Sequence, residues 1–175
     1  NVAKIKGNGI EINGTEYAQS ELASSDKGIN INASKIKLSG ETQANSDINL
    51  NGNVENKSNI YTGGNLNTLD MVNSGNINAG DGAVAMYSKG GNVDLTGGTI
   101  NVGNNQAVGV FIADDATNPL KTTVKNTGTN MTVGTNAFGY VVDSTTGTDL
   151  LLGTATNKLT ASLGPSYCVD DSSRV

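Results

Sequence analysis

Short runs in which apolar and polar residues alternate recur along most of the chain, as in Gly75-Asn76-Ile77-Asn78. The apolar residue at the centre of such a run advances in three steps of 23 residues, at Ile31, Val54, Ile77 and Ile100. Alternation with a period of two indicates strands, and a fixed repeat in the twenties is typical of a solenoid, whose coils bury their apolar faces by stacking. We therefore predict that these four residues form one structural column along the axis.

The column is predicted to continue at Met131 after an insert. The step from Ile100 to Met131 exceeds the repeat by the length of one segment of loop character, 113–120. Removing this segment restores the period. A polar ladder is expected beside the column, or else its members simply serve corners: Asn30, Asn53, Asn76, Thr99 and Asn130.

Each coil contains three short apolar runs separated by Gly, Asn and Asp corners. One coil is expected to hold Ile77 with Ala79, Val84 with Met86, and Val93 with Leu95. A spacing of two puts each pair on one face of its strand, and three such faces close a triangular interior. The prediction is an all-β chain that folds as a right-handed parallel β-helix, or β-solenoid, with about 23 residues and three short strands per coil.

The coils are expected to span 28–164, with different structure at both ends of the chain. Segment 1–27 follows the period poorly and is predicted to be irregular or an entry coil; its Asn13-Gly14 is either a hairpin turn or a solenoid corner. Residues 18–25 are compatible with a helical turn. Segment 165–175 holds the only Arg and the only Cys of the chain and no repeat motif, so we expect an atypical, unstructured tail.

Composition agrees with a narrow stacked core. Only 35% of the residues are hydrophobic and 4% aromatic, and 23 Gly stand against 2 Pro. A core that grows along one axis needs small and medium side chains, Gly supplies corners, and Pro would remove ladder donors. The net charge of −5 is too modest for a chain kept disordered by repulsion, and it argues against nucleic acid as a partner.

Candidate chemistry is limited to carboxylates. The chain has no His, so His-based triads and zinc sites with His ligands are excluded, and we predict no catalytic residues, metal or cofactor. Asp114 and Asp115 could join Asp143 or Asp149 in an acid/base pair or a calcium site, but adjacent Asp residues in an Asn-Pro loop are more typical of a solvated turn.

The insert is the place where the coil rule is broken, and insertions in repeat proteins map to loops that often bind partners. Its polar residues Asp114, Asp115 and Asn118 are therefore the candidate binding site. The alternative is a tolerated, functionally neutral insertion.

The chain resembles the passenger repeats of autotransporter (type V secretion) adhesins of Gram-negative bacteria. The resemblance covers about Gly28 to Gly153 and rests on the strings 73–80, 83–87 and 97–103, with 107–111 and 137–140 echoing the second. It implies export, display at the outer membrane by a C-terminal β-barrel that is not present here, an extracellular location, and contact with a host-cell or bacterial surface protein or glycan. No residue role can be carried over from the family.

The sequence thus leads to the hypothesis of a fragment of a surface-displayed adhesin that serves as a β-helical stalk with possible binding loops. A fragment of a carbohydrate-active β-helix enzyme, such as a polysaccharide lyase or hydrolase, is the first alternative. An inert structural spacer is the second.

Overall fold

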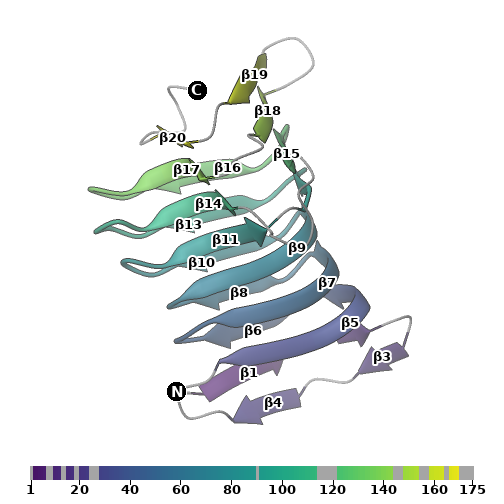
Figure 1. Ribbon diagram of the computed structural model, residues 1–175. Coiled ribbons are helices and arrows are strands. Elements are labelled where there is room, and N and C mark those ends of the chain that lie inside the picture. Colours follow the sequence, from purple (N-terminus) through teal and green to yellow (C-terminus); the bar gives the residue numbers. More distant parts are fainter. Residues whose placement is uncertain are drawn as a thin grey trace.

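The chain forms a parallel β-solenoid whose coils stack into a rod (Figure 1). The computed structural model describes residues 2–6, 10–12, 15–17, 20–23, 28–89, 91–113, 122–143, 148–153, 158–163 and 166–169. All elements in these segments are strands, and none of the described segments is a helix long and apolar enough to cross a membrane. The all-β solenoid predicted from the alternation of apolar residues is therefore confirmed.

The solenoid wall has three faces, each a parallel ladder of strands. We call face 3 the five strands β6 (Glu41–Ala44), β8 (Asn59–Thr62), β10 (Asn76–Ala79), β13 (Thr99–Val102) and β16 (Asn130–Val133). Faces 1 and 2 belong to a single larger sheet. Face 1 consists of the first halves of β5 (Ile29–Leu38), β7 (Ile48–Asn56) and β9 (Asn65–Asn73), followed by β11 (Val84–Lys89), β14 (Val108–Ala113) and β17 (Phe138–Asp143). Face 2 consists of the second halves of β5, β7 and β9, followed by β12 (Val93–Leu95), β15 (Thr122–Asn126) and β18 (Thr148–Gly153).

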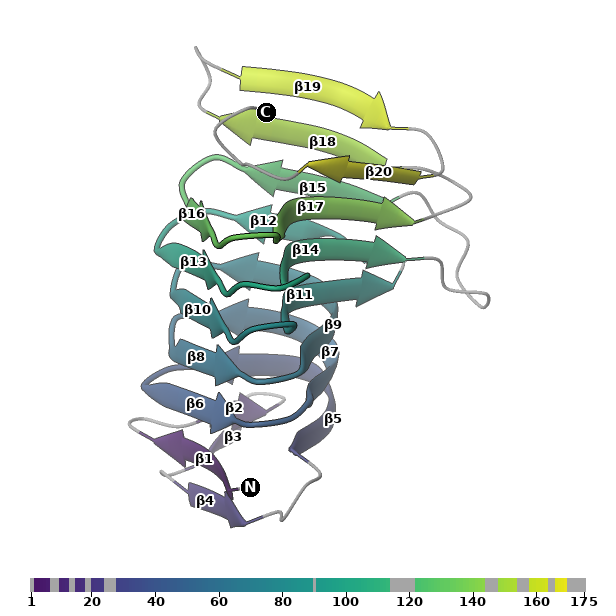
Figure 2. The ribbon, with the colours of Figure 1, turned by 90° about the vertical axis from the view of Figure 1, so that its left-hand side faces the viewer.

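The coils are right-handed. In Figure 2 the strands of face 3 run from left to right on the near side, β12 and β15 return from right to left on the far side, and the chain climbs from β6 toward β18. This is the sense in which parallel crossovers are almost always wound.

Faces 1 and 2 are fused in the first coils and separate in the later ones. In β5 and β7 a single long strand bends across both faces, with a shift of register after Asn32 and after Leu50. Gly52 lies at the second bend, where a Cβ would collide with the carbonyl oxygen of Ala33. The prediction of three separate strands per coil therefore describes the turn that runs through β10, β11 and β12, whereas the earlier coils merge two of the three.

Coil length changes along the rod. Hydrogen bonds between neighbouring coils span 17 residues from Asn59 to Asn76, 23 residues from Asn76 to Thr99, and 31 residues from Asn104 to Thr135. The predicted repeat is thus the length of one coil, that between β10 and β13, and other coils are shorter or longer.

The predicted column is correct only in its upper part. Ile77, Ile100 and Met131 stack on one another in face 3, as expected. Ile31 instead pairs with Leu50 in face 1, and Val54 pairs with Met71 in face 2. The fixed repeat of 23 residues misassigned Ile31 and Val54 because the early coils are shorter than the repeat. There, a step of 23 residues leads to the next coil and also to the next face.

The rod core is one continuous apolar cluster, and it includes the two residues that the predicted column misassigned. Ile77 and Ile100 are fully buried, and Ile31 and Val54 also point inward, to other sides of the same core. The core residues with the least exposure and the largest side chains are Ile29, Ile36, Leu38, Ile48, Leu50, Ile60, Leu66, Met71, Ile77, Met86 and Leu95.

Antiparallel strands lie at both ends of the rod. At the N-terminal end, β1 (Val2–Lys6) pairs with β6 and β4 (Ser20–Ala23), and β2 (Ile10–Ile12) pairs with β5 and β3 (Thr15–Tyr17). At the C-terminal end, β19 (Lys158–Leu163) pairs with β18, and β20 (Ser166–Val169) pairs with β17. These antiparallel strands occupy edges that a parallel solenoid would otherwise leave open to pairing with other chains.

The strands at the two ends of the chain bear on three predictions: the hairpin, the helical turn and the unstructured tail. Asn13 and Gly14 lie outside the described residues, and the strands on either side of them pair antiparallel, as the hairpin alternative predicts. The helical turn expected at 18–25 is wrong for Ser20–Ala23, which form β4 and pair with β1, and the rest of that segment lies outside the described residues. The expectation of an unstructured tail is wrong for Ser166–Val169, whose backbone forms β20 along β17, and residues 170–175 lie outside the described part of the chain.

Candidate functional site

The predicted binding residues Asp114, Asp115 and Asn118 lie outside the described residues. The structure does place the start of their segment. Ala113, which was assigned to the insert, is the last residue of β14 and pairs with Lys89 and Asp143. The insert therefore begins after Ala113, and it follows a strand end that is flanked by a lysine and an aspartate.

Of the four carboxylates proposed for an acid/base pair or calcium site, only Asp143 has a side chain among the described residues. Asp143 is exposed at the end of β17, and Asp149 lies in β18, where its backbone pairs with Thr123. Among residues whose side chains are described, no group of three or more Asp, Glu, Cys or His could hold a metal ion.

Polar side chains at the corners instead accept backbone hydrogen bonds from the next coil. Asp47 Oδ1 accepts from the N–H of Asn65 at 2.8 Å, and Asp70 Oδ1 accepts from that of Asn92 at 2.7 Å. Equivalent bonds run from the N–H of Asn104 to Asp81 Oδ1 and from the N–H of Thr135 to Asn104 Oδ1, both at 2.8 Å. These side chains supply partners for corner N–H groups that the strand ladders do not reach.

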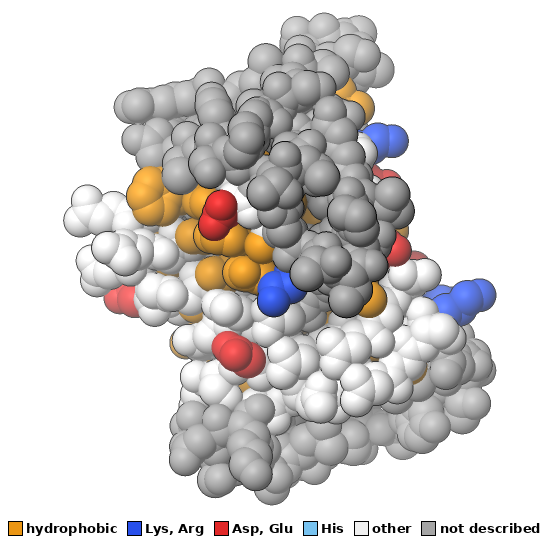
Figure 3. All heavy atoms as spheres, viewed as in Figure 1, with side chains coloured by type: hydrophobic (Ala, Val, Ile, Leu, Met, Phe, Trp, Pro, Cys, Tyr) orange, Lys and Arg blue, Asp and Glu red, His pale blue; other side chains and the backbone are white. Residues whose placement is uncertain are grey.

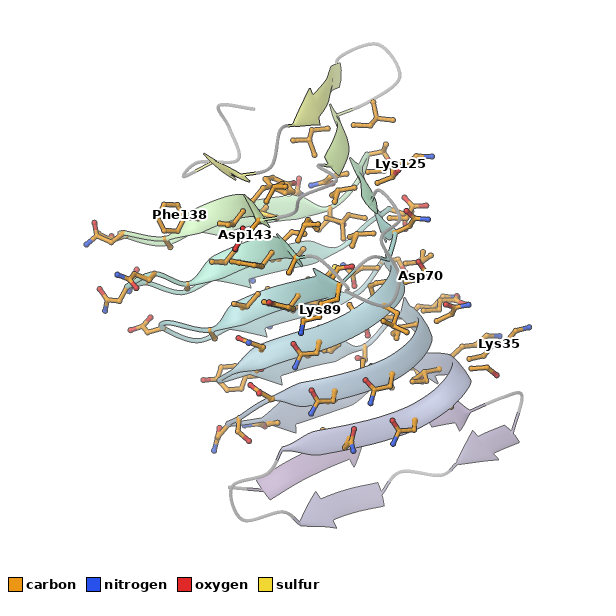
Figure 4. The ribbon with its side chains drawn as sticks, in the orientation of Figure 1. Lys35, Asp70, Lys89, Lys125, Phe138 and Asp143 are labelled. Carbon is orange, nitrogen blue, oxygen red and sulfur yellow. The ribbon has the colours of Figure 1, made fainter. Side chains whose placement is uncertain are left out.

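Asparagine side chains form ladders on the outer surface of the first coils. On face 1, Asn51 Nδ2 donates to Asn32 Oδ1 at 2.6 Å and to Asn30 Oδ1 at 3.2 Å. One coil further, Asn67 Nδ2 donates to Asn49 Oδ1 at 2.7 Å. The amides extend from successive strands of the blue part of the ribbon in Figure 4. Stacked amides of this kind stabilise cross-β assemblies in the same way.

The ladder expected from the sequence is found in part. Thr99 Oγ1 donates to Asn76 Oδ1 at 2.8 Å, and the backbones of Thr99 and Asn130 pair in the next step. Asn30 contacts Asn51 instead of Asn53, for the same reason that Ile31 lies on Leu50. Asn76 itself donates to Asn59 at 2.7 Å, so the ladder continues downward through a residue that the fixed stride passed over.

A further asparagine ladder lies inside the rod. Asn56 and Asn73 are fully buried on face 2, and Asn56 Nδ2 donates to Asn73 Oδ1 at 2.8 Å. Asn56 Oδ1 also accepts from the N–H and the hydroxyl of Ser58, at 3.0 and 2.6 Å. Asn73 Oδ1 accepts from the N–H of Gly75 at 3.2 Å. The two amides thus provide hydrogen-bond partners for the buried backbone N–H groups at the corner between faces 2 and 3, where the chain leaves the strand ladder.

An apolar patch lies on the outer side of face 1, over the later coils. Residues at equivalent positions of β11, β14 and β17 form two outward columns: Val84, Val108 and Phe138, and Tyr87, Phe111 and Val141. The rings of Tyr87 and Phe111 stack with their centroids 4.9 Å apart and an angle of 4° between their planes. In Figure 3 hydrophobic side chains gather here, between an acidic and a basic side chain.

Charged residues flank the patch at the end of its strands. The third outward column is Lys89, Ala113 and Asp143, with Lys89 and Asp143 both exposed. Lys89 Nζ lies 5.9 Å from the centroid of the Tyr87 ring, within the range of a cation–π contact. Figure 4 shows Phe138, Asp143 and Lys89 on the same side of the rod.

This patch was not predicted from the sequence, although the signal was present. In the first coils apolar and polar residues alternate strictly, as they do over Ile48–Leu50. In β11, β14 and β17 apolar residues follow one another without alternation, as in the run from Tyr140 to Val142. Because neighbouring residues of a strand point to opposite faces, an unbroken apolar run places apolar side chains outside as well as inside.

Comparison with known proteins adds no assignment to this site. The chain matches no protein-family model, and searches of curated protein sequences and of solved structures likewise return no match.

Proposed function

We propose that this chain is a β-solenoid stalk segment of a bacterial adhesin displayed at the cell surface. The observation that carries the proposal is the continuity of the rod: one apolar core runs through its coils, and inter-coil hydrogen bonds reinforce the wall at strands and corners alike. Such a chain gains stability one neighbour at a time as each coil is added, which suits a protein that folds progressively as it emerges outside the cell.

The resemblance of the repeat strings to autotransporter passengers supports the same proposal. Strings 73–80 and 97–103 carry that resemblance, and both lie where a face 3 strand follows a glycine corner, at β10 and β13. In this proposal the stalk holds binding segments away from the membrane, and the segment after Ala113 is the first candidate to contact a host-cell or bacterial surface protein or glycan.

Surface display is tested with antibodies raised against the chain and applied to intact cells of the bacterium that encodes it. We expect labelling without permeabilisation, and loss of the label after brief treatment of the cells with protease. Labelling that requires permeabilised cells would overturn the proposal.

The register of the strands defines a loop deletion that should leave the rod intact. Ala113 pairs with Lys89, and Val124 pairs with Val93; Ala113 and Val124 lie one coil above their partners. Deletion of 114–120 joins Ala113 directly to Lys121, and the connection to Val124 then has the same length as the one between Lys89 and Val93. The variant should therefore fold with the same circular dichroism spectrum as the wild type.

Binding is tested with beads coated with the chain or with this deletion variant, applied to host cells, bacterial cells and a glycan array. Binding that is lost in the variant supports a binding loop. Equal binding by the two proteins excludes the loop and assigns the contact to the rod surface. A chain that binds nothing is a spacer within the stalk.

A further inference from the structure

The apolar patch on face 1 has the composition of an interface. Its two outward columns contain three half-buried aromatic residues, and both Phe residues of the chain are among them. The valines beside these rings are buried, whereas Lys89 and Asp143 at the margin are exposed. An outward apolar cluster that contains aromatic residues and has charged residues at its margin is the usual composition of a protein–protein contact.

The arrangement of sizes in the patch is self-complementary. In one column the large side chain is at the upper coil, Phe138, and in the other the large side chains are at the lower and middle coils, Tyr87 and Phe111. Consider a two-fold axis that runs parallel to β14, just outside the outer surface of face 1. Rotation about it reverses the direction of the solenoid axis but leaves the position of each residue along its strand unchanged. It therefore places Phe138 opposite Val84 of the second copy, and Tyr87 opposite Val141 of the second copy, so that these large side chains meet small ones. Phe111 lies beside the axis and faces Phe111 of the second copy.

The same axis matches the charges. Lys89 and Asp143 belong to one outward column, one coil below and one coil above Ala113. Reversal of the solenoid axis brings Lys89 of each copy opposite Asp143 of the other, which gives two identical pairs of opposite charge at the margin. Ala113 then faces its own equivalent across the axis, where its small side chain lets the strand ends approach.

We propose that the chain forms an antiparallel homodimer through the apolar patch, with the two-fold axis parallel to β14. The interface is isologous, with the same surface on both copies, and it joins two rods side by side with their ends pointing in opposite directions. This proposal does not depend on the adhesin function, because it rests on the size and charge pattern of face 1 alone.

The first test is the oligomeric state of the full chain, measured by sedimentation equilibrium in low salt. We expect a dimer that dissociates on dilution. Lys89→Glu and Asp143→Lys should each raise the dissociation constant by about tenfold or more, because each places two pairs of like charges in the interface. The double variant Lys89→Glu/Asp143→Lys restores opposite charges and should return the dissociation constant to within about threefold of the wild type.

Rescue by the double variant is the decisive result, since a charge that acted only on folding or solubility would not be rescued by its reversal across the interface. A wild-type chain that stays monomeric up to about 100 μM, or a double variant no tighter than the single ones, would overturn the proposal. Tyr61→Asp is the matched control, because Tyr61 is an exposed aromatic residue on face 3 and its substitution should leave the dimer unchanged.

Cross-linking gives a second, independent measurement. Ala113→Cys in a Cys168→Ser background should form a disulfide-linked dimer under mild oxidation, because Ala113 lies beside the proposed axis. Tyr61→Cys in the same background should stay largely monomeric. Equal cross-linking of the two cysteine variants contradicts the proposed axis even if a dimer exists.

Discussion

Asn56 and Asn73 stand directly above one another in the interior of the rod, and the amide of Asn56 donates to Asn73 Oδ1 at 2.8 Å. Both side chains are fully buried. In the next coil the equivalent position is Leu95, so the ladder of buried asparagines ends at Asn73. Buried amides are tolerated here because each also bonds the backbone of the corner beside it.

Asn73→Leu should therefore destabilise the rod although leucine fits the position one coil above. The change removes the acceptor of the Asn56 amide, which then keeps only a 3.4 Å contact with the carbonyl oxygen of Ser58. We expect a loss of about 1 to 3 kcal/mol in urea denaturation followed by circular dichroism. Asn78→Ala, which removes an amide from the outer surface, is the control and should cost no more than about 0.5 kcal/mol. An Asn73→Leu variant as stable as the wild type would show that the buried ladder adds nothing to the rod.

Ile77→Asp should unfold the chain. Ile77 is fully buried between Ile60 and Ile100, so the substitution places a charge without a partner in the middle of an apolar column. A loss of more than about 4 kcal/mol is expected, against about 1 kcal/mol for Ile77→Val, which only shortens the side chain. A wild-type denaturation midpoint for Ile77→Asp would contradict the register of face 3.

Gly98 and Gly82 are two corner glycines at which the effect of substitution by alanine can be compared. Both have a positive φ, of 71° and 69°, which disfavours any other residue. A Cβ at Gly98 would collide with the carbonyl oxygen of Gly75 in the coil below, whereas at Gly82 the nearest atom is the carbonyl oxygen of Asn105, 3.7 Å away. Gly82→Ala should cost about 1 kcal/mol, and Gly98→Ala about 3 kcal/mol or more, in thermal or urea unfolding. Equal losses would show that coil spacing adapts to a methyl group.

The fold class could be predicted from the sequence because every coil of a solenoid requires the same pattern of strand and corner residues. Alternation indicated the strands, glycine and asparagine marked the corners, and the pairing of Ile77 with Ile100 followed from the repeat. The assignments of Ile31 and Val54 failed because all three faces of a triangular core require the same kind of residue. A stride that moves by one coil and one face therefore lands on a buried apolar residue, just as a stride of one coil does.

The surface features were harder to predict for a different physical reason. Whether Val108 and Phe111 point inward or outward depends on the register of their strand with its neighbours. A run of consecutive apolar residues fits either direction, so the sequence alone does not fix this register. The asparagine ladders also depend on register, so only the steps from Asn76 to Thr99 and from Thr99 to Asn130 follow the prediction. The start of the insert was misplaced by a single position, since Ala113 belongs to β14.

Stability at alkaline pH should depend on Tyr140. This side chain points into the core and is only 3% exposed, and burial raises the pKa of its hydroxyl above the usual value of 10.0, with the hydrogen bond from Asn126 Nδ2 at 3.0 Å opposing the rise. The folded state therefore holds the phenol proton at a pH where the unfolded chain has released it, and the free energy of unfolding falls as the pH rises above about 10. Below that pH the group makes no contribution to the slope.

Tyr140→Phe removes the titrating hydroxyl and should flatten this part of the pH profile. Urea denaturation between about pH 9 and 11 is the measurement, with the slope of unfolding free energy against pH compared between the two proteins. The variant should be less stable than the wild type near neutral pH by about 1 kcal/mol, because Asn126 loses its partner, and the difference should shrink as the pH rises. Parallel profiles for Tyr140→Phe and the wild type would show that the Tyr140 hydroxyl reaches water in the folded chain.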